Sequence, residues 1–391
     1  MFFIAKRLTA CGLLIDKSPQ KMYNIFIKEK GLEKMKILHT SDIHLDSPLT
    51  SRLPSDKVRE RRRELLSNFK RLVDEAKAHG AEAIIISGDL FDSNKISRKA
   101  LDTALDVIEA EGGITFLYLQ GNHEGDALVV SGRALPENLK LFSEEWTYHT
   151  VGKVTFAGRN EICEGMFNSL SLPEDGKNIV ILHGELRDKS SYPESIGLRE
   201  AAGKNIDYLA LGHYHSYSAE AIDDRGAAVY CGTPEGRGFD EAGDKGYVIL
   251  STDSSRVLYS FRSFAKRRLH IVPLELDGAV RTVEVGERAE RALRGIPGSD
   301  IVRLELCGRY FPTLWKDVEG LKRDYEHRYY YFEIKDTSRI AINPEDYKHD
   351  MSLKGEFIRT VSADSSLDEE TRERIIACGI NALMGEELFD A

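Results

Sequence analysis

Five short apolar runs along the chain each end at residues that can bind a metal ion. The residues at these ends are Asp42 with His44, Asp89, Asn122 with His123, His183, and His213 with His215. One such run, Ile179–Leu182, leads directly into His183. Continuous apolar runs are typical of buried parallel strands, whose carboxyl ends gather along one rim of an α/β sheet. The pattern therefore predicts an α/β fold that brings these distant side chains together.

A longer amphipathic pattern predicts a helix from Ser55 to His79, with Ser55 as its cap and Gly80 at its end. Its apolar face consists of Val58, Leu65, Leu66, Phe69, Leu72, Val73 and Ala76. The opposite face carries Lys57, Arg59, Arg61, Arg62 and Arg63. Taken singly, these basic side chains fit a solvated face with salt links to Glu60 and Glu64. As a cluster, the four arginines are candidates for contacts with a phosphate backbone.

The last third of the chain changes its pattern. The stretches Gly246–Leu250 and Arg256–Phe261 are expected to be closing strands of a second sheet, and the basic stretch Ala265–Arg268 follows them. Strands and helices then alternate, with strands over His270–Leu276, Ile301–Leu306 and Arg328–Ile334 and helices over Glu287–Leu293 and Thr313–Tyr325. A last helix, Asp368–Met384, carries one apolar face, which consists of Ile375, Ile376, Ile380 and Leu383. That face suits packing on the chain's own core or binding of a partner's coiled coil.

These patterns predict four parts. Residues 1–34 form an extension that the fold does not need, because Met35 directly precedes the first strand. Residues 35–264 form the main α/β domain, and the basic stretch marks its boundary with a smaller α/β domain over residues 265–345. Residues 346–391 form a C-terminal segment with a helix.

Composition is consistent with a cytoplasmic protein of more than one domain. At 391 residues and 41% hydrophobic content, the chain can bury a large core. The five cysteines are odd in number and show no C-x-x-C spacing, which argues against a disulfide framework. No run approaches the roughly 20 apolar residues of a membrane span. Leu8–Cys11 resembles a lipoprotein cleavage box, but Lys6 and Arg7 stand where a signal peptide needs its apolar core.

The residue types at the strand ends suit two divalent cations. Imidazoles recruit transition metals, carboxylates add charge and can bridge, and an Asn carbonyl fills a neutral position. Asp42 and His44 lie two residues apart, as do His213 and His215, so an extended backbone would point both members of each pair the same way. Two metals about 3.5 to 4 Å apart can clamp the attacking and departing oxygens of a phosphoryl displacement. A histidine-rich mixed site suits manganese better than magnesium.

Other residues next to these ligands have a backbone or supporting role. Gly88, Gly121, Gly184 and Gly212 are expected where a strand turns sharply and a metal or phosphate approaches the main chain. His39 and Glu124 either steady the ligands or are ordinary polar residues. The net charge of -10 argues against binding of nucleic acid over the whole surface. It still allows a DNA enzyme, because two dications and a local arginine cluster can attract a phosphate to one cleft.

The motifs, taken in order, resemble those of the calcineurin-like metallophosphoesterase superfamily. They are Asp42-x-His44, Gly88-Asp89-x-x-Asp92, Gly121-Asn122-His123-Glu124, His183-Gly184 and Gly212-His213-x-His215. The resemblance implies two sheets sandwiched between helices. It also implies one metal held by Asp42, His44 and His215, another held by Asn122, His183 and His213, and Asp89 as the bridge between them. His123 would then protonate or stabilise the leaving oxygen, with Asp92 orienting its imidazole.

Within this superfamily the chain is most similar to the SbcD-type DNA-repair exonucleases. The markers are Leu38–Asp46, Gly88–Asp92, Tyr230–Glu235 leading to Phe239 and Glu241, and Lys245–Tyr247. The resemblance implies a DNA substrate, an SMC-like ATPase partner of the SbcC type, a homodimer, and a small α/β domain that caps the nuclease site. Within that domain, Arg328–Phe332 sets aromatic beside basic residues, which could stack on bases or fill the strand's own core.

Three functions remain open from the sequence. The motif context favours a two-metal DNA exonuclease that works with an ATPase. A phosphodiesterase or phosphatase for small molecules would use the same metals but needs a closed pocket over the site. A catalytically inactive scaffold of the same fold is expected to lose ligands, whereas this chain retains the whole set, including His123.

Overall fold

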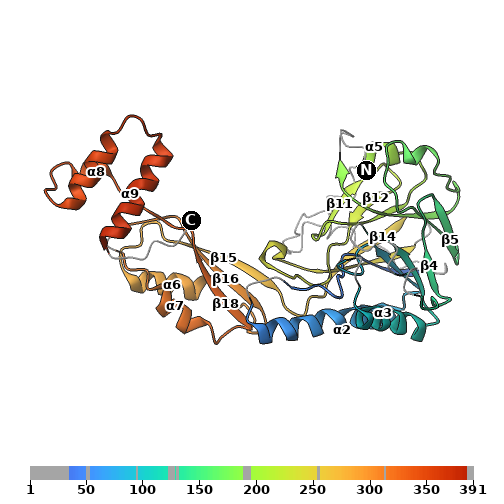
Figure 1. The fold of residues 1–391 in the computed structure, drawn as a ribbon. Helices are drawn as coiled ribbons and strands as arrows, with labels where there is room; N and C mark the ends of the chain where they lie inside the picture. The colour runs from blue at the N-terminus through green and yellow to red at the C-terminus, as the bar shows by residue number, and fades with distance from the viewer. Residues whose placement is uncertain are drawn as a thin grey trace, which may run out of the picture. The chain divides into compact units, whose positions relative to one another are not determined.

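The computed structural model describes residues 35–49, 53–93, 96–121, 128, 132–187, 195–252, 256–311 and 314–384 (Figure 1). The extension predicted over residues 1–34 lies outside these described residues, and so do Asn122, His123 and Glu124. The stretch from Met35 to Ala391 forms one compact unit, to which all the elements below belong.

The first predicted strand lies in the middle of a six-stranded sheet. In spatial order the sheet contains β14 (Val257–Ser263), β13 (Gly246–Thr252), β1 (Lys36–Thr40), β2 (Ala83–Ser87), β3 (Thr115–Leu119) and β4 (Leu139–Leu141). Strands β1 to β4 run parallel, as the apolar runs predict. The expectation that β13 and β14 close a second sheet is wrong. They pair antiparallel on the free edge of β1, which would otherwise expose its backbone groups.

A second six-stranded sheet packs against the first. It contains β11 (Ser218–Ala221), β12 (Ala227–Tyr230), β10 (Tyr208–Gly212), β7 (Lys177–His183), β6 (Val154–Gly158) and β5 (Thr147–Val151). The four inner strands are parallel, and the two outer ones are antiparallel to their neighbours. Ile37 and Ile85 of one sheet share a fully buried apolar cluster with Ile179 and Ala210 of the other. The two-sheet α/β fold expected from the sequence is therefore present.

Helices cover the outer faces of both sheets. On the first sheet α2 (Ser55–His79) and α3 (Arg98–Ala110) lie side by side, and Phe69 and Leu105 pack against its strands (Figure 1). Helix α2 has its predicted bounds, and Gly80 ends it with φ 68°. Ser55 is not its cap, because Pro54 holds the cap position and no side chain caps the helix. The outer face of the second sheet packs on η1 (Met166–Asn168), β9 (Ile196–Gly197) and α5 (Leu198–Ala201), and β8 (Leu186–Arg187) pairs with β9.

The next part is a small parallel sheet with helices on one face. Its strands β15 (Leu269–Glu275), β16 (Ile301–Cys307) and β18 (Tyr331–Asp336) alternate with α6 (Thr282–Ala292) and α7 (Val318–Tyr325), and β17 (Arg309–Tyr310) pairs with β19 (Arg339–Ile340). The predicted alternation of strands and helices is confirmed. The helix starts differ most: α6 begins five residues before its predicted start, and α7 begins five residues after its own. Helix α7 follows Asp317, whose carboxylate accepts a hydrogen bond from the Gly320 amide. Both helices pack on the face that carries Val302, Leu304 and Phe332.

The C-terminal segment is a pair of helices that pack on each other. After η3 (Pro344–Tyr347), α8 (Leu353–Ala363) and α9 (Glu369–Met384) lie side by side (red in Figure 1). Ile376 and Ile380 of α9 are buried against Ile358 of α8, whereas Ile375 and Leu383 are 37% and 46% exposed. The predicted apolar face of α9 is thus divided between an internal contact and solvent. Across the described part of the chain, no helix combines the length and apolar character needed to cross a membrane.

Candidate metal centre

The predicted ligands that the structure describes meet at the rim where the carboxyl ends of the two sheets come together. Asp42 and Asp89 follow β1 and β2, while His183 and His213 stand at the ends of β7 and β10. Two backbone hydrogen bonds tie the loops after β1 and β2: the Asp42 amide donates to the Gly88 carbonyl, and the His44 amide donates to the Asp89 carbonyl. Residues that are far apart in the sequence are therefore held on one side of the molecule by strand pairing.

Two groups of side chains offer ligand atoms that all lie within 4.8 Å of one another. One group is Asp42, His44 and His215, and the other is Asp42, Asp89 and His183. The first group is the ligand set that the resemblance assigns to one metal. Asp42 and Asp89 are 0% and 2% exposed, so both carboxylates are removed from water. Burying them without compensation is costly, and a bound cation would supply the compensation.

The imidazoles of His44, His183 and His215 each turn the Nε2 atom toward the Asp42 or Asp89 carboxylate. The Nδ1 atom of His183 lies 2.9 Å from the Ser87 carbonyl, and the Nδ1 atom of His215 lies 2.7 Å from Glu241 Oε1. His44 Nδ1 lies 3.0 Å from Asp92 Oδ1. For His183 and His215, an oxygen at Nδ1 fixes the proton there and leaves the Nε2 lone pair for a metal, whereas the His44–Asp92 contact has the distance of an ion pair without hydrogen-bond geometry. The arrangement supports all three histidines as ligands.

Asp89 is placed to reach ligands of both predicted metals. Its Oδ2 atom lies 3.9 Å from His44 Nε2 and 3.5 Å from His183 Nε2. Asp42 also belongs to both ligand groups, and its Oδ1 atom lies 3.5 Å from His215 Nε2. His213 is in neither group, although its ring centroid lies 5.5 Å from that of His183. The assignment of Asp89 as the bridge therefore remains a prediction.

The catalytic pair predicted from the resemblance is only partly described. His123 and the ligand Asn122 lie outside the described residues, so their roles stay predictions. Asp92 contacts the ligand His44 and forms an ion pair with Arg237, with Oδ1 2.6 Å from Nη1. Asp92 thus orients an imidazole, and among the described residues that imidazole belongs to His44.

The ligand loops have strained backbone conformations. Asp42, His44, Asp89 and His213 have φ values of 50°, 49°, 52° and 100°, a region that non-glycine residues rarely adopt. Such strain collects at functional sites, where the surrounding structure enforces it. The expectation that an extended backbone aligns Asp42 with His44 is wrong, because both residues have left-handed φ values in the loop that follows β1. These left-handed residues bring both side chains to the site instead.

Two glycines make room for the ligands. A Cβ atom on Gly88 would lie 2.0 Å from His183 Nδ1, and one on Gly121 would lie 1.9 Å from Asp89 Oδ1. Gly88 also has φ +94°, which favours glycine on conformational grounds. The ligand side chains approach the main chain closely at both glycines. The predicted approach of a metal or phosphate stays a prediction.

The electrostatics of the site fit a divalent cation. Burial raises the pKa of the Asp42 carboxyl, but contact with His215 and the nearby His183 outweigh burial and hold that pKa well below its usual range. Burial lowers the pKa of His215, but Asp42 and Glu241 outweigh it and raise the pKa to about 9. Both shifts reflect buried carboxylates set beside imidazoles. Carboxylate oxygen and imidazole nitrogen together form a donor set that suits manganese, iron or zinc.

Sequence reasoning missed Arg237. Its guanidinium pairs with Asp92 and, 2.9 Å away, with Glu241, and these two carboxylates hold the Nδ1 atoms of His44 and His215. The Arg237 guanidinium therefore supports, through two carboxylates, two histidine ligands of the same predicted metal. The available signal was the position of Arg237 between the markers Glu235 and Glu241.

His39 is a buried supporting residue. Its Nε2 atom lies 2.8 Å from Ser87 Oγ and its Nδ1 atom 2.9 Å from the Tyr208 hydroxyl. Burial lowers its pKa to about 3, so the ring is neutral at physiological pH. Because the Ser87 carbonyl orients His183, His39 steadies the ligand set from the layer between the sheets.

The arginine cluster predicted on α2 is divided by the fold. Arg59, Arg62 and Arg63 are exposed, whereas Arg61 is 1% exposed and lies 2.8 Å from Glu64 and 2.7 Å from Glu235. The inclusion of Arg61 in a solvated, phosphate-binding face is therefore wrong, because its guanidinium is committed inside the protein.

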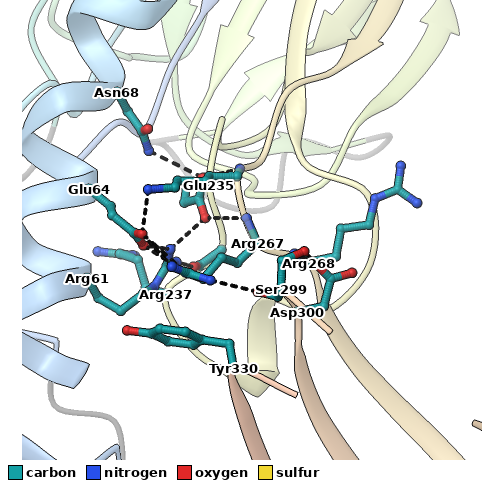
Figure 2. Close-up of polar contacts among 12 residues, drawn as sticks. Arg61, Glu64, Asn68, Glu235, Arg237, Arg267, Arg268, Ser299, Asp300 and Tyr330 are labelled. Atoms are coloured by element: carbon teal, nitrogen blue, oxygen red, sulfur yellow. Dashed lines mark hydrogen bonds and ion pairs between the residues drawn. The ribbon is translucent and has the colours of Figure 1, made fainter. Parts of the chain in front are cut away.

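Arg61 belongs to a polar cluster that joins α2 to the start of the small sheet. Figure 2 shows Arg61, Glu64 and Asn68 of α2 facing Glu235 and Arg267. The buried Glu235 carboxylate accepts hydrogen bonds from the backbone amides of residues 266 and 267 at 2.7 Å and 3.1 Å. The Arg267 guanidinium also stacks on the Tyr330 ring, 3.5 Å from its centroid. We call these residues the junction cluster.

Comparisons with known proteins agree with this site. Residues 35–250 match the family described as calcineurin-like phosphoesterase. The uncharacterised metallophosphoesterase YhaO of Bacillus subtilis is 26% identical over 249 residues, 59% of this chain and 60% of that protein. The DNA double-strand break repair protein Mre11 of Sulfurisphaera tokodaii is 27% identical over 218 residues, 52% of this chain and 55% of that protein. The chain thus spans at most 60% of the length of these two relatives.

A solved structure of a purple acid phosphatase from yellow lupin seeds aligns with a TM-score of 0.39 and 13% identity. The alignment covers 59% of this chain and 52% of that one.

Proposed function

Because the chain belongs to the calcineurin-like phosphoesterase family, which its residues 35–250 match, we propose that it is a metal-dependent nuclease that hydrolyses DNA phosphodiester bonds. Phosphoester hydrolysis at a dinuclear metal site is the chemistry of this family. The observation that carries the proposal is the buried cluster of Asp42 and Asp89 with three imidazoles whose Nε2 atoms turn inward.

The proposal also names DNA as the substrate. Its support is the identity shared with a DNA double-strand break repair protein, together with motifs similar to those of SbcD-type exonucleases. The exposed side chains of Arg59, Arg62 and Arg63 on α2 are proposed to contact the phosphate backbone. The rest of the surface carries the net negative charge of the chain, so DNA binding would be confined to the side that carries these arginines.

The proposal assigns a task to each predicted site residue. Asp42, His44 and His215 would hold one divalent cation, proposed to be Mn²⁺, and His183 and His213 with Asn122 would hold the second. The cations supply positive charge that binds the phosphate and lowers the pKa of water toward neutrality. Arg237 and its two carboxylates keep the His44 and His215 rings in place. His123 is proposed to protonate the leaving oxygen.

We also propose an SMC-like ATPase partner, a homodimer and a cytoplasmic location, all from the resemblance to SbcD-type proteins. The partner would bind the α8–α9 pair, where Leu353, Ile375 and Leu383 are 69%, 37% and 46% exposed. Co-sedimentation with a purified SMC-like ATPase from the same organism tests this. Leu383→Asp is expected to abolish the complex, and Leu258→Asp, at a 37% exposed leucine on β14, is expected to leave it intact. Light scattering of the chain alone tests the dimer.

The nuclease proposal is tested with labelled linear duplex DNA in the presence of Mn²⁺. Degradation of the duplex is expected for the wild type and not for His123→Ala, whose metal content should stay unchanged. Bis-p-nitrophenyl phosphate, mononucleotides and cyclic nucleotides are assayed in parallel. Intact DNA, both alone and with the ATPase, together with rapid turnover of these small esters would contradict the nuclease and establish the second candidate.

That second candidate is a phosphodiesterase for small molecules, and one observation favours it. A cavity of about 700 Å³ adjoins the metal centre and includes Asp92 and Glu241 in its wall. Pockets of this size accept small organic ligands. An inactive scaffold is the weakest alternative, because the described ligands retain both their positions and their supporting residues.

A further inference from the structure

A cavity lies next to the metal centre, and the hydrolytic reaction itself does not explain it. It measures about 700 Å³, and it lies between the loop that follows β12 and the small sheet β15–β16–β18. Asp92 and Glu241 belong both to its wall and to the support of the ligands His44 and His215. Anything bound in the cavity is therefore one side-chain layer away from the metal ligands.

One wall of the cavity is the face of the small sheet opposite its helices. Side chains alternate between the two faces of a strand, so Val302 and Leu304 pack on α6 and α7 while Ile301 and Arg303 face the cavity. The strand register sets Ile301 beside Tyr331 and Arg303 beside Glu333. The sequence segment 328–332, with its adjacent aromatics, thus sends Tyr331 to the cavity and Phe332 to the core.

The aromatic part of the wall is held rigidly. The Arg303 guanidinium lies over the Phe239 ring, 4.0 Å from its centroid, and its Nε atom donates to Glu333 Oε1 at 2.5 Å. The Tyr331 hydroxyl donates to the other oxygen of Glu333 at 3.0 Å. Phe239, Arg303, Glu333 and Tyr331 therefore form a fixed chain of contacts. A flat ligand would meet a surface that already has its shape.

The charge of the wall decides what kind of ligand fits. Its carboxylates are Asp92, Asp240, Glu241 and Glu333, whereas its cationic side chains are Arg237 and Arg303. Four carboxylates against two guanidinium groups repel a polyphosphate or a second backbone phosphate. Aromatic and apolar surface with carboxylate acceptors suits an uncharged ring that carries amino groups, as nucleobases do.

We propose that this cavity binds the nucleoside attached to the scissile phosphate, with its base against Tyr331 and Phe239, while the phosphate itself lies at the metal centre. The inference rests on the proposed phosphodiester hydrolysis and names the part of the substrate that the enzyme recognises. It has a structural consequence for DNA: a base enters the cavity only after it leaves the base stack. Terminal or single-stranded nucleotides are therefore the preferred substrates.

The test compares two esters with the same leaving group, thymidine 5′-(p-nitrophenyl phosphate) and methyl p-nitrophenyl phosphate. The wild type is expected to show a lower KM for the thymidine ester. Tyr331→Ala is expected to raise that KM about tenfold, a loss typical of one base stack, and to leave the methyl ester unchanged. Tyr331→Phe keeps the ring and should retain the wild-type KM within about twofold, since it loses only one hydrogen bond.

The matched control is Ile271→Ala. Ile271 lies on the same sheet face as Leu269, two residues further along β15, but it does not line the cavity and is 40% exposed. This variant should leave both KM values unchanged. Titration calorimetry of thymidine 5′-monophosphate onto the metal-loaded protein gives a readout without turnover, and Tyr331→Ala should weaken this binding by a similar factor.

The outcomes separate this inference from the proposed function. Hydrolysis of both esters with equal KM, unaltered in Tyr331→Ala, would overturn the nucleoside site and leave the phosphodiesterase intact. Hydrolysis of neither ester, with thymidine monophosphate bound normally and lost in Tyr331→Ala, would contradict the proposed function alone. Faster degradation of a single-stranded oligonucleotide than of a blunt duplex, with the preference lost in Tyr331→Ala, identifies DNA as the source of the nucleoside. Turnover of the thymidine ester without degradation of either DNA substrate identifies a small nucleotide as the source of the nucleoside.

Discussion

The loop after β12 contributes residues to two clusters of buried charge, which differ in how that charge is balanced. In the junction cluster the Glu64 and Glu235 carboxylates pair with Arg61 and Arg267 at distances of 2.7 to 2.8 Å. In the metal centre the Asp42 carboxylate is contacted by the Ser41 hydroxyl, the His213 amide and the His215 imidazole. Carboxylates balanced by guanidinium groups serve to join structural elements. Carboxylates set among imidazoles and neutral donors form a place for an added cation.

The largest effect that tests this difference between the clusters is expected when a carboxylate of the metal centre is neutralised. Asp89→Asn is expected to lose bound metal and to reduce hydrolysis about 10⁴-fold, since metal ions stabilise the transition state by several kcal/mol. Metal content by mass spectrometry and hydrolysis of bis-p-nitrophenyl phosphate measure both effects.

The control is Asp207→Asn. Asp207 is also buried, at 5% exposure, but it is paired with Lys177 and Arg225. This variant should lose stability and keep its metal. Normal metal content in Asp89→Asn would contradict the role of Asp89 as a ligand.

The junction cluster should respond in the opposite way. Glu235→Ala leaves the buried Arg61 without its closest carboxylate, and breaking a buried pair costs about 3 to 5 kcal/mol. The free energy of unfolding, measured with a denaturant, should fall by this amount while metal content stays unchanged. Glu60→Ala is the matched control, because Glu60 pairs with Arg267 at the surface, where a salt bridge contributes about 0 to 1 kcal/mol. Equal effects of the two substitutions would show that the cluster is not effectively buried.

The pH dependence of stability sharpens the same contrast. Burial raises the pKa of Glu64, but Arg267, Lys266 and Arg61 outweigh it and lower the pKa from its ordinary value of 4.5 to about 2. A depressed pKa contributes stability above 4.5 that is lost as the pH falls toward 2.

Glu64→Gln removes this contribution, so it should destabilise the protein by about 1 to 3 kcal/mol at pH 7. The difference between the two proteins should shrink as the pH falls below about 4.5. Unfolding in denaturant at a series of pH values checks this, and a difference that stays constant across the series would contradict it.

The smallest expected effect separates the exposed arginines from the buried one. Arg63→Ala should weaken DNA binding uniformly across sequences and reduce the salt dependence of binding by about one unit of slope. Its effect on stability should stay within about 0.5 kcal/mol, since Arg63 is exposed. Fluorescence anisotropy at several salt concentrations measures the slope. Arg98→Ala, at a 94% exposed arginine on α3, should change neither property, and an unchanged slope in Arg63→Ala would remove this residue from the DNA-binding face.

Local sequence predicted the elements of this protein well, because hydrophobic periodicity is set residue by residue. The bounds of α2 and the alternation of strands and helices after residue 265 follow from it. The position of β13 and β14 does not, because the pairing of a strand depends on which sheet edge is free once the chain has folded. For the same reason the burial of Arg61 could not be predicted. The local pattern places Arg61 on the polar side of α2, whereas its burial depends on Glu235, 174 residues away in the sequence.

For the described residues, the sequence by itself determined which side chains gather at the rim of the sheets, because each follows an apolar run within a few residues and parallel strands bring their carboxyl ends together. Only the tertiary structure decided how they act. The oxygen that fixes each Nδ1 atom, Arg237 behind two ligands, and the cavity that combines Phe239 with Tyr331 all depend on contacts between distant segments. Side-chain chemistry is encoded locally, whereas the orientation of a donor atom and the shape of a cavity arise only when separate elements pack against each other.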